Sequence, residues 1–161
     1  MTREGVRRIR LEIEYRELLE FCAKCNAVKA VKVLKTDNGV PVKYMLEISI
    51  RTYISETDMT NNSVIDVTID KNYPWSLPFV FMHDPVVFHP NWYESGKWCG
   101  IPGDATESLS GLIFKVLRST AFDEVMVNLY SVSNSKAYEW YIQNMDKPGM
   151  FPTQIIHKLS S

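Results

Sequence analysis

Residues 89–99 read HPNWYESGKWC, and the interpretation of the whole chain starts from this stretch. It opens with His89-Pro90-Asn91 and closes with a cysteine, Cys99, ten positions after the histidine. A strained proline–asparagine turn can hold an amide side chain beside a thiol. Acyl transfer through a thioester needs such a pair: a sulfur nucleophile and a neutral donor for the oxyanion that forms when an amine attacks. Cys99 is therefore a candidate nucleophile and Asn91 its candidate partner.

The composition is that of a single soluble domain. The 161 residues suffice for one core, so we take residues 1–161 as one domain, and the 45% hydrophobic and 23% charged content is ordinary. A formal net charge of −1 provides no broad basic surface for nucleic acid. No apolar run reaches the ~18 residues of a membrane span, and the arginine-rich start lacks the apolar stretch of a secretory signal. Three cysteines, an odd number, favour a reducing compartment. We expect a cytoplasmic protein that acts on neither membrane nor nucleic acid.

Residues 1–25 are predicted to form an amphipathic helix. Its predicted buried stripe consists of Val6, Ile9, Ile13, Leu18, Leu19 and Cys22. Its predicted solvent face carries Arg7, Glu14, Arg16 and Glu17. Cys22 and Cys25 are spaced as in some zinc sites, but no second Cys/His pair could complete the site, so we assign them to packing and expect no metal.

An antiparallel meander should follow the helix. Lysines alternate with apolar residues from 27 onward, and Asn38-Gly39 predicts a hairpin to a strand over residues 42–54. After a polar loop over 55–62, strands are predicted over 63–69 and 79–82. Residues 83–103 have no period and are predicted to form one long ordered loop. Two helices end the pattern, one capped by Ser108 or Ser110 and one starting at Ser133 or Asn134. The predicted class is α+β, with helices gathered on one side of a four-stranded antiparallel sheet.

The order of these motifs resembles the ubiquitin-conjugating enzyme family from the first helix to about residue 144. The matching residues are Tyr73-Pro74 with Pro78 (a Tyr-Pro-x-x-x-Pro element), His89-Pro90-Asn91, Gly96, Cys99, Lys115-Val116-Leu117, and Asn134 with Ala137 and Tyr138. Each match alone is weak, but their shared order and spacing are specific. The resemblance implies the fold of that family. No cofactor is implied.

The resemblance also implies roles for individual residues. Cys99 would accept a ubiquitin-like modifier as a thioester from an activating enzyme and pass it to a lysine amine of a protein target. Asn91 would stabilise the oxyanion or brace the loop, and His89 would hold the loop in place. Arg7 and Arg8 on the first helix would dock the activating enzyme. Trp75 stands where the family has an aromatic contact to its ligases.

The chain also departs from the family pattern. Gly100-Ile101-Pro102-Gly103 replaces the family's Leu-Asp-x-Leu, and the segment before the next helix is shorter, so binding of a ligase stays open. The acidic residue that flanks the family's cysteine has three candidates here, Asp104, Glu107 and Ser131. Such divergence is similar to bacterial members encoded with their own ubiquitin-like protein in antiviral defence operons.

Two other classes of function compete with a conjugating enzyme. One is a non-catalytic variant of the same fold, or a related RWD-type binding module, although such proteins generally lack the cysteine. The other is a Cys-His hydrolase, which requires a histidine within hydrogen-bond distance of Cys99. Trp92 and Trp98 are either lids over the core or exposed contacts for a modifier's tail.

Overall fold

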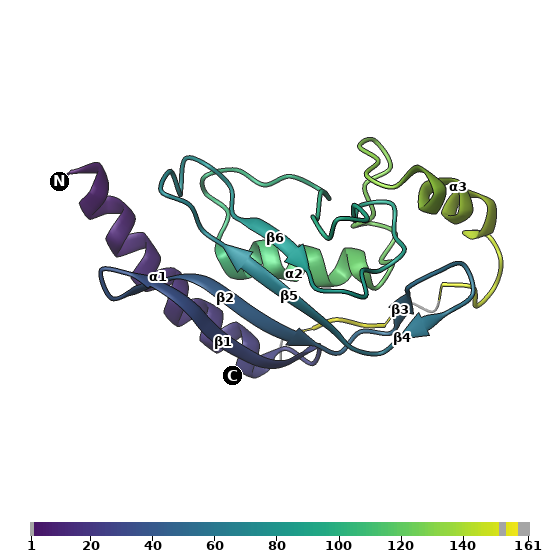
Figure 1. Cartoon of the computed structure of the whole chain (residues 1–161), viewed down its shortest axis with the longest axis horizontal. Helices are drawn as coiled ribbons and strands as arrows, with labels where there is room; N and C mark the ends of the chain where they lie inside the picture. The colour runs from purple at the N-terminus through teal and green to yellow at the C-terminus, as the bar shows by residue number, and fades with distance from the viewer. Residues whose placement is uncertain (1, 152–153, 158–161) are drawn as a thin grey trace.

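A computed structural model describes residues 2–151 and 154–157, so Met1, residues 152–153 and residues 158–161 lie outside the described part of the chain. The elements, in chain order, are α1 (Arg3–Lys24), β1 (Val28–Asp37), β2 (Val40–Ile48), β3 (Thr52–Tyr53), β4 (Met59–Thr60), β5 (Ser63–Thr68), β6 (Phe79–Met82), α2 (Leu109–Thr120) and α3 (Ser135–Asn144) (Figure 1). No helix within residues 2–151 and 154–157 is both long and apolar enough to cross a membrane.

The main sheet is an antiparallel meander in the order β1-β2-β5-β6, which confirms the predicted four-stranded sheet. Asn38 and Gly39 form the first hairpin turn with φ angles of 51° and 78°, the backbone that an Asn-Gly pair favours. The predicted strand over 42–54 is wrong at its C-terminal end. β2 stops at Ile48, and the chain continues into β3, which pairs with β4 in a separate small sheet.

The core lies between the inner face of the main sheet and the helices α1 and α2. Alternate residues of β2 and β5, such as Tyr44, Leu46 and Ile65, are fully buried there together with Ile113 and Leu117 of α2. In Figure 1, α2 lies behind β5 and β6. Ser108 caps α2 by accepting a hydrogen bond from the Gly111 N–H, and this cap settles one of the two predicted starts.

The buried face of α1 differs from the prediction. Leu11, Leu18, Phe21 and Cys22 are buried together with two charged residues, Arg7 and Glu14. The exposed fractions of Val6, Ile9, Ile13 and Leu19 are 42, 46, 40 and 38%, so most of the predicted apolar stripe faces solvent. Apolar spacing alone gave the wrong rotation because both buried charges have partners that lie far away in the sequence.

Each of these partners belongs to a segment packed against α1. The Arg7 guanidinium donates to the Asp70 carbonyl at 2.9 Å. The Glu14 carboxylate accepts the Leu109 N–H at the N-terminus of α2 and lies 3.3 Å from the Arg10 guanidinium. A carboxylate is favoured at a helix N-terminus, where unpaired N–H groups and the helix dipole attract negative charge. These contacts stabilise two buried charges that would otherwise be costly.

A second cluster of buried residues lies at the α3 end of the molecule. It is aromatic, and Tyr53, Phe122, Trp140 and Tyr141 form its centre. Asn134 caps α3 by accepting the Ala137 N–H, so the helix follows Asn134 rather than Ser133. Figure 1 shows α3 at the opposite end of the molecule from the N-terminus of α1. The long loop after β6 runs between these two ends and carries the predicted site.

Candidate active site

The loop that carries Cys99 is attached to the edge of the sheet. Two residues of β6, Met82 and Val80, bond to the loop. The Met82 N–H donates to the Gly96 carbonyl, and the Val80 carbonyl accepts the Trp98 N–H. Gly96 has a φ of +104°, and a Cβ atom there would lie 2.6 Å from the Met82 carbonyl oxygen. A glycine is therefore required for this close approach. The attachment places Cys99 directly after a segment that covers the β6 edge.

His89 is fully buried and has partners on both ring nitrogens. Its Nε2 lies 2.6 Å from the Ser119 carbonyl oxygen, and its Nδ1 accepts the Asn91 N–H at 2.9 Å. Burial lowers the pKa of His89 from 6.5 to about 4, and the hydrogen bond to the Ser119 carbonyl only partly offsets this. The ring is thus neutral at pH 7, with Nε2–H as its donor. Because both nitrogens are occupied, His89 cannot deprotonate Cys99. His89 is the histidine nearest to Cys99 in the sequence, so it cannot serve as the base that a Cys-His hydrolase requires.

The Asn91 side chain is fully buried and braces another loop. Its Nδ2 donates to the carbonyls of Asn128 at 2.7 Å and Ser131 at 3.3 Å, and its Oδ1 accepts the Asn128 N–H at 2.8 Å. Both amide hydrogens are therefore engaged. The Asn91 carbonyl in turn accepts the Cys99 N–H at 2.8 Å. Asn91 thus joins the backbone at Cys99 to residues 128–131.

The two tryptophans of the loop reach the last turn of α2. The Trp92 indole N–H donates to the Thr120 hydroxyl at 3.1 Å, and the Trp98 indole N–H donates to the Ser119 hydroxyl at 3.1 Å. Trp92 is fully buried, whereas Trp98 is partly buried. The Ser119 carbonyl also accepts a hydrogen bond from His89. Ser119 of α2 therefore contacts the loop both at His89 and at Trp98.

The Cys99 thiol is partly exposed and is a free cysteine. The following residue, Gly100, is buried, and a Cβ atom there would lie 2.1 Å from the Trp98 ring. The Gly100 carbonyl accepts the Asn128 Nδ2 at 3.3 Å. The backbone that follows the thiol therefore packs closely against the Trp98 ring and is hydrogen-bonded to the Asn128 side chain.

The three candidates for a flanking acidic or polar residue lie in different places. The Asp104 carboxylate accepts hydrogen bonds from Thr106, which lower the pKa of Asp104, and Glu107 pairs with Lys115 at 2.8 Å. Both carboxylates therefore have local partners next to the start of α2. Ser131 belongs to the loop that Asn91 holds. Of the three, the structure joins Ser131 to Asn91.

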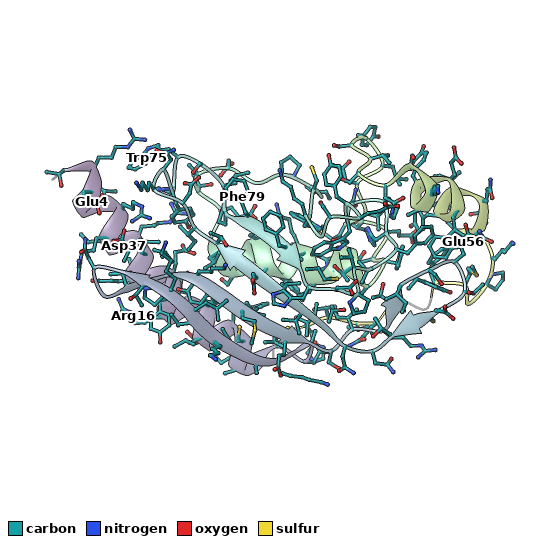
Figure 2. All side chains as sticks on the ribbon, in the orientation of Figure 1. Glu4, Arg16, Asp37, Glu56, Trp75 and Phe79 are labelled. Atoms are coloured by element: carbon teal, nitrogen blue, oxygen red, sulfur yellow. The ribbon has the colours of Figure 1, made fainter. Side chains whose placement is uncertain are left out.

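The predicted docking residues divide into one buried and two accessible side chains. Arg7 is buried and donates to the Asp70 carbonyl, so its side chain does not lie on the exposed face of α1. Arg8 is exposed and pairs with Glu12 at 3.4 Å. Trp75 is 50% exposed, and the Arg3 guanidinium lies 4.0 Å from its ring centroid. Figure 2 shows Trp75 beside the N-terminal turn of α1.

Cys22 and Cys25 both lie in the main hydrophobic core, as the packing interpretation predicts. Burial raises the pKa of Cys22 to about 12, so this thiol stays neutral. Within the described residues, no group of three or more His, Cys, Asp or Glu side chains is arranged to hold a metal ion.

Comparison with solved structures identifies the class of fold. S. cerevisiae Ubc12 superposes with a TM-score of 0.61 and 18% sequence identity, covering 85% of this chain and 71% of that one. A ubiquitin conjugating enzyme E2 from Plasmodium falciparum superposes with a TM-score of 0.52 and 19% identity, covering 70% and 96% of the two chains. The chain thus has the ubiquitin-conjugating fold, which confirms the predicted resemblance at the level of structure. Its sequence matches no model of a known protein family and no curated protein.

Sequence reasoning missed two residues that build this site, Asn128 and Ser119. The Asn128 Oδ1 accepts the N–H of Tyr130, two residues on, which is a local turn motif typical of asparagine. Ser119 bonds to the Val116 carbonyl within its own helix, as serine often does. From the sequence, Asn128 could be expected to form a turn and Ser119 to bond within its helix. Neither expectation indicates that Asn128 bonds to Asn91 and Gly100, or that Ser119 bonds to His89 and Trp98.

Proposed function

We propose that this protein is a ubiquitin-conjugating-type transferase. It would carry a ubiquitin-like modifier as a thioester on Cys99 and transfer it to the amine of a lysine on a protein target. One observation carries this proposal: a partly exposed free thiol follows the His89-Pro90-Asn91 turn on a loop held by the sheet, α2 and residues 128–131, within the ubiquitin-conjugating fold. A chain that used this fold for binding alone would not need a thiol at that position.

The proposed reaction conserves atoms and charge. In loading, the Cys99 thiolate attacks the thioester carbonyl held by the activating enzyme, and the thiolate of that enzyme leaves. In transfer, a neutral amine attacks the carbonyl carbon on Cys99, and the carbonyl π electrons move onto oxygen. The oxyanion then collapses, the C–S bond breaks, and a proton lost by the amine nitrogen ends on the Cys99 thiolate through solvent. His89 takes no part as a base because its ring nitrogens are occupied.

The activating enzyme would dock on the exposed face of α1. That face carries Arg8 and the exposed apolar side chains Val6, Ile9 and Ile13, a mixture of charge and apolar area suited to a protein partner. A ligase contact at Trp75 is supported by its 50% exposure and by its place next to α1.

A lysine trap tests carrier function directly. Cys99→Lys protein is recovered from its native cells and compared with wild type by intact mass spectrometry. A lysine at position 99 should hold the modifier through a stable isopeptide bond, so a discrete added mass that maps to residue 99 is expected. Cys99→Ala should gain no mass and should unfold at the same temperature as wild type, because a partly exposed thiol contributes little to packing.

A matched control removes the thiol and places the lysine at a neighbouring position instead of at residue 99. Ser95 is exposed on the same loop, so the double variant Cys99→Ala, Ser95→Lys offers a neighbouring amine with no thiol. This variant should stay unmodified. If Cys99→Lys also stays unmodified in cells that contain the native activating enzyme, the transferase proposal fails and a non-catalytic module of this fold replaces it.

A further inference from the structure

The amide group that contacts the chain at the nucleophile belongs to Asn128. Its Nδ2 donates to the carbonyl of Gly100, the residue directly after Cys99, at 3.3 Å. Asn128 is half-buried, in contrast to Asn91, which is fully buried. A side-chain amide that is bonded to the residue after Cys99 and is partly accessible can meet a group bound to the thiol.

The hydrogen bonds of Asn91 leave it no free donor. Its Nδ2 donates to two carbonyl oxygens and its Oδ1 accepts a backbone N–H. If the amide were flipped, its oxygen would lie against the two carbonyl oxygens, which is unfavourable. To stabilise an oxyanion, this amide would have to break its hydrogen bonds to both carbonyls. Asn91 is therefore placed to hold residues 128–131 rather than to meet substrate.

The hydrogen bonds of Asn128 fix its amide in the opposite sense. Its Oδ1 accepts the Tyr130 N–H at 2.9 Å, and its Nδ2 points toward the carbonyl of Gly100. Among the described residues, Gly100 is the one acceptor for this Nδ2 group, so one of its two amide hydrogens stays available. The backbone of Asn128, in turn, is clamped by Asn91 through its N–H and its carbonyl.

We infer that Asn128 supplies the amide donor for the oxyanion formed at the thioester carbonyl on Cys99, and that Asn91 is the positioning residue that holds it. This inference rests on the proposed function. During aminolysis the carbonyl oxygen gains negative charge as the C–N bond forms and loses it as the C–S bond breaks. A neutral amide fixed beside the thiol stabilises that charge without a proton transfer of its own.

The contacts of Asn128 allow its two roles to be separated. The hydrogen bonds of Asn91 to Asn128 go to its backbone, so a change of the Asn128 side chain leaves that clamp in place. Asn128→Asp keeps the size of the side chain and the acceptor for the Tyr130 N–H but removes both amide hydrogens. Asn62→Asp, on the exposed turn before β5, makes the same change of charge elsewhere and serves as the matched control.

The test uses a small acyl donor, so it needs neither the modifier nor its activating enzyme. Cys99 is acylated by thiol exchange with the 2-mercaptoethanesulfonate thioester of acetyl-Gly-Gly. The acyl enzyme is purified and then discharged with free lysine, and intact mass spectrometry follows both steps. We expect Asn128→Asp to keep the stability of wild type in urea denaturation and to discharge ~100-fold more slowly, the usual loss for one oxyanion donor. Loading should be slower as well, because thiol exchange also forms an oxyanion at the attacked carbonyl. Asn62→Asp should match wild type in both steps.

Two results would overturn the inference. Discharge of Asn128→Asp within tenfold of wild type shows that its amide is not the donor. Slowing of both steps together with a clear loss of stability in urea denaturation shows a structural role instead. If Asn128→Asp does not fold, as judged by circular dichroism, Asn128→Ala decides by the same criteria. Failure of wild-type protein to hold an acyl group on Cys99 would contradict the proposed function itself, and would be seen before any variant is compared.

Discussion

The buried imidazole of His89 predicts a measurable dependence of stability on pH. Burial lowers its pKa to about 4 in the folded protein, whereas the unfolded chain titrates near 6.5. Between these two values the unfolded state binds the extra proton, so stability must fall as the pH is lowered. The contribution of His89 to the free energy of unfolding is complete above pH 6.5 and is lost progressively toward pH 4.

The size of the effect follows from the shift. Each pH unit in this window changes the free energy of unfolding by up to about 1.4 kcal/mol. Between pH 7.5 and pH 4.5, His89 should therefore remove about 2.5 kcal/mol, a large share of the roughly 5–15 kcal/mol that stabilises a domain. Carboxylates titrate over the lower part of the same range, so the effect of His89 has to be measured as a difference between two proteins.

The assay is urea denaturation of wild type and His89→Gln at pH 7.5, 6.5, 5.5 and 4.5. Glutamine can retain one hydrogen bond but cannot titrate. Wild type should be the more stable protein at pH 7.5, and its advantage should shrink by about 2.5 kcal/mol at pH 4.5. His83→Gln, at an exposed histidine beside Asp66, controls for the loss of an imidazole as such. If the stabilities of wild type and His89→Gln stay parallel across this range, the assignment of a buried neutral ring is wrong.

Two further predictions concern the backbone of the active-site loop and the face of α1. Gly96→Ala should cost more than about 2 kcal/mol in denaturation because it combines a positive φ with a clash against the Met82 carbonyl. Gly149→Ala, with a φ of +72° and open space around it, should cost only about 1 kcal/mol, and equal costs would contradict the role of the close approach. Leu18→Ala should cost about 3–5 kcal/mol and Ile9→Ala under about 1 kcal/mol, whereas the reverse order would restore the sequence-based assignment of the helix face.

Much of the fold could be predicted because its signals are local. The Asn38-Gly39 turn adopts the positive φ angles that few other residue pairs accept, so it marks the first hairpin without reference to the rest of the chain. Ser108 and Asn134 each accept a hydrogen bond from an N–H three residues later, so they cap their helices by short-range chemistry. The alternation of β5 follows the pleat of any half-buried strand.

The face of α1 could not be predicted because burial of a charge depends on distant partners. Arg7 and Glu14 have charged side chains, and they fall on the same predicted helix face as Arg16 and Glu17. This pattern predicted that the face is exposed to solvent. The carbonyl of Asp70 and the N–H of Leu109, 63 and 95 residues away in the sequence, make burial favourable. With those partners present, Ile9 and its apolar neighbours are left to face solvent.

The candidate site shows the same division. The amino-acid sequence shows which groups are present: a thiol at Cys99, an amide at Asn91 and a histidine at position 89, in the order and spacing of the ubiquitin-conjugating family. What those groups can do depends on their contacts in the folded chain. Asn91 meets the backbone of Asn128, 37 residues away, and this contact uses its donors. An amide has two hydrogens to donate, and only the folded chain determines which acceptors receive them.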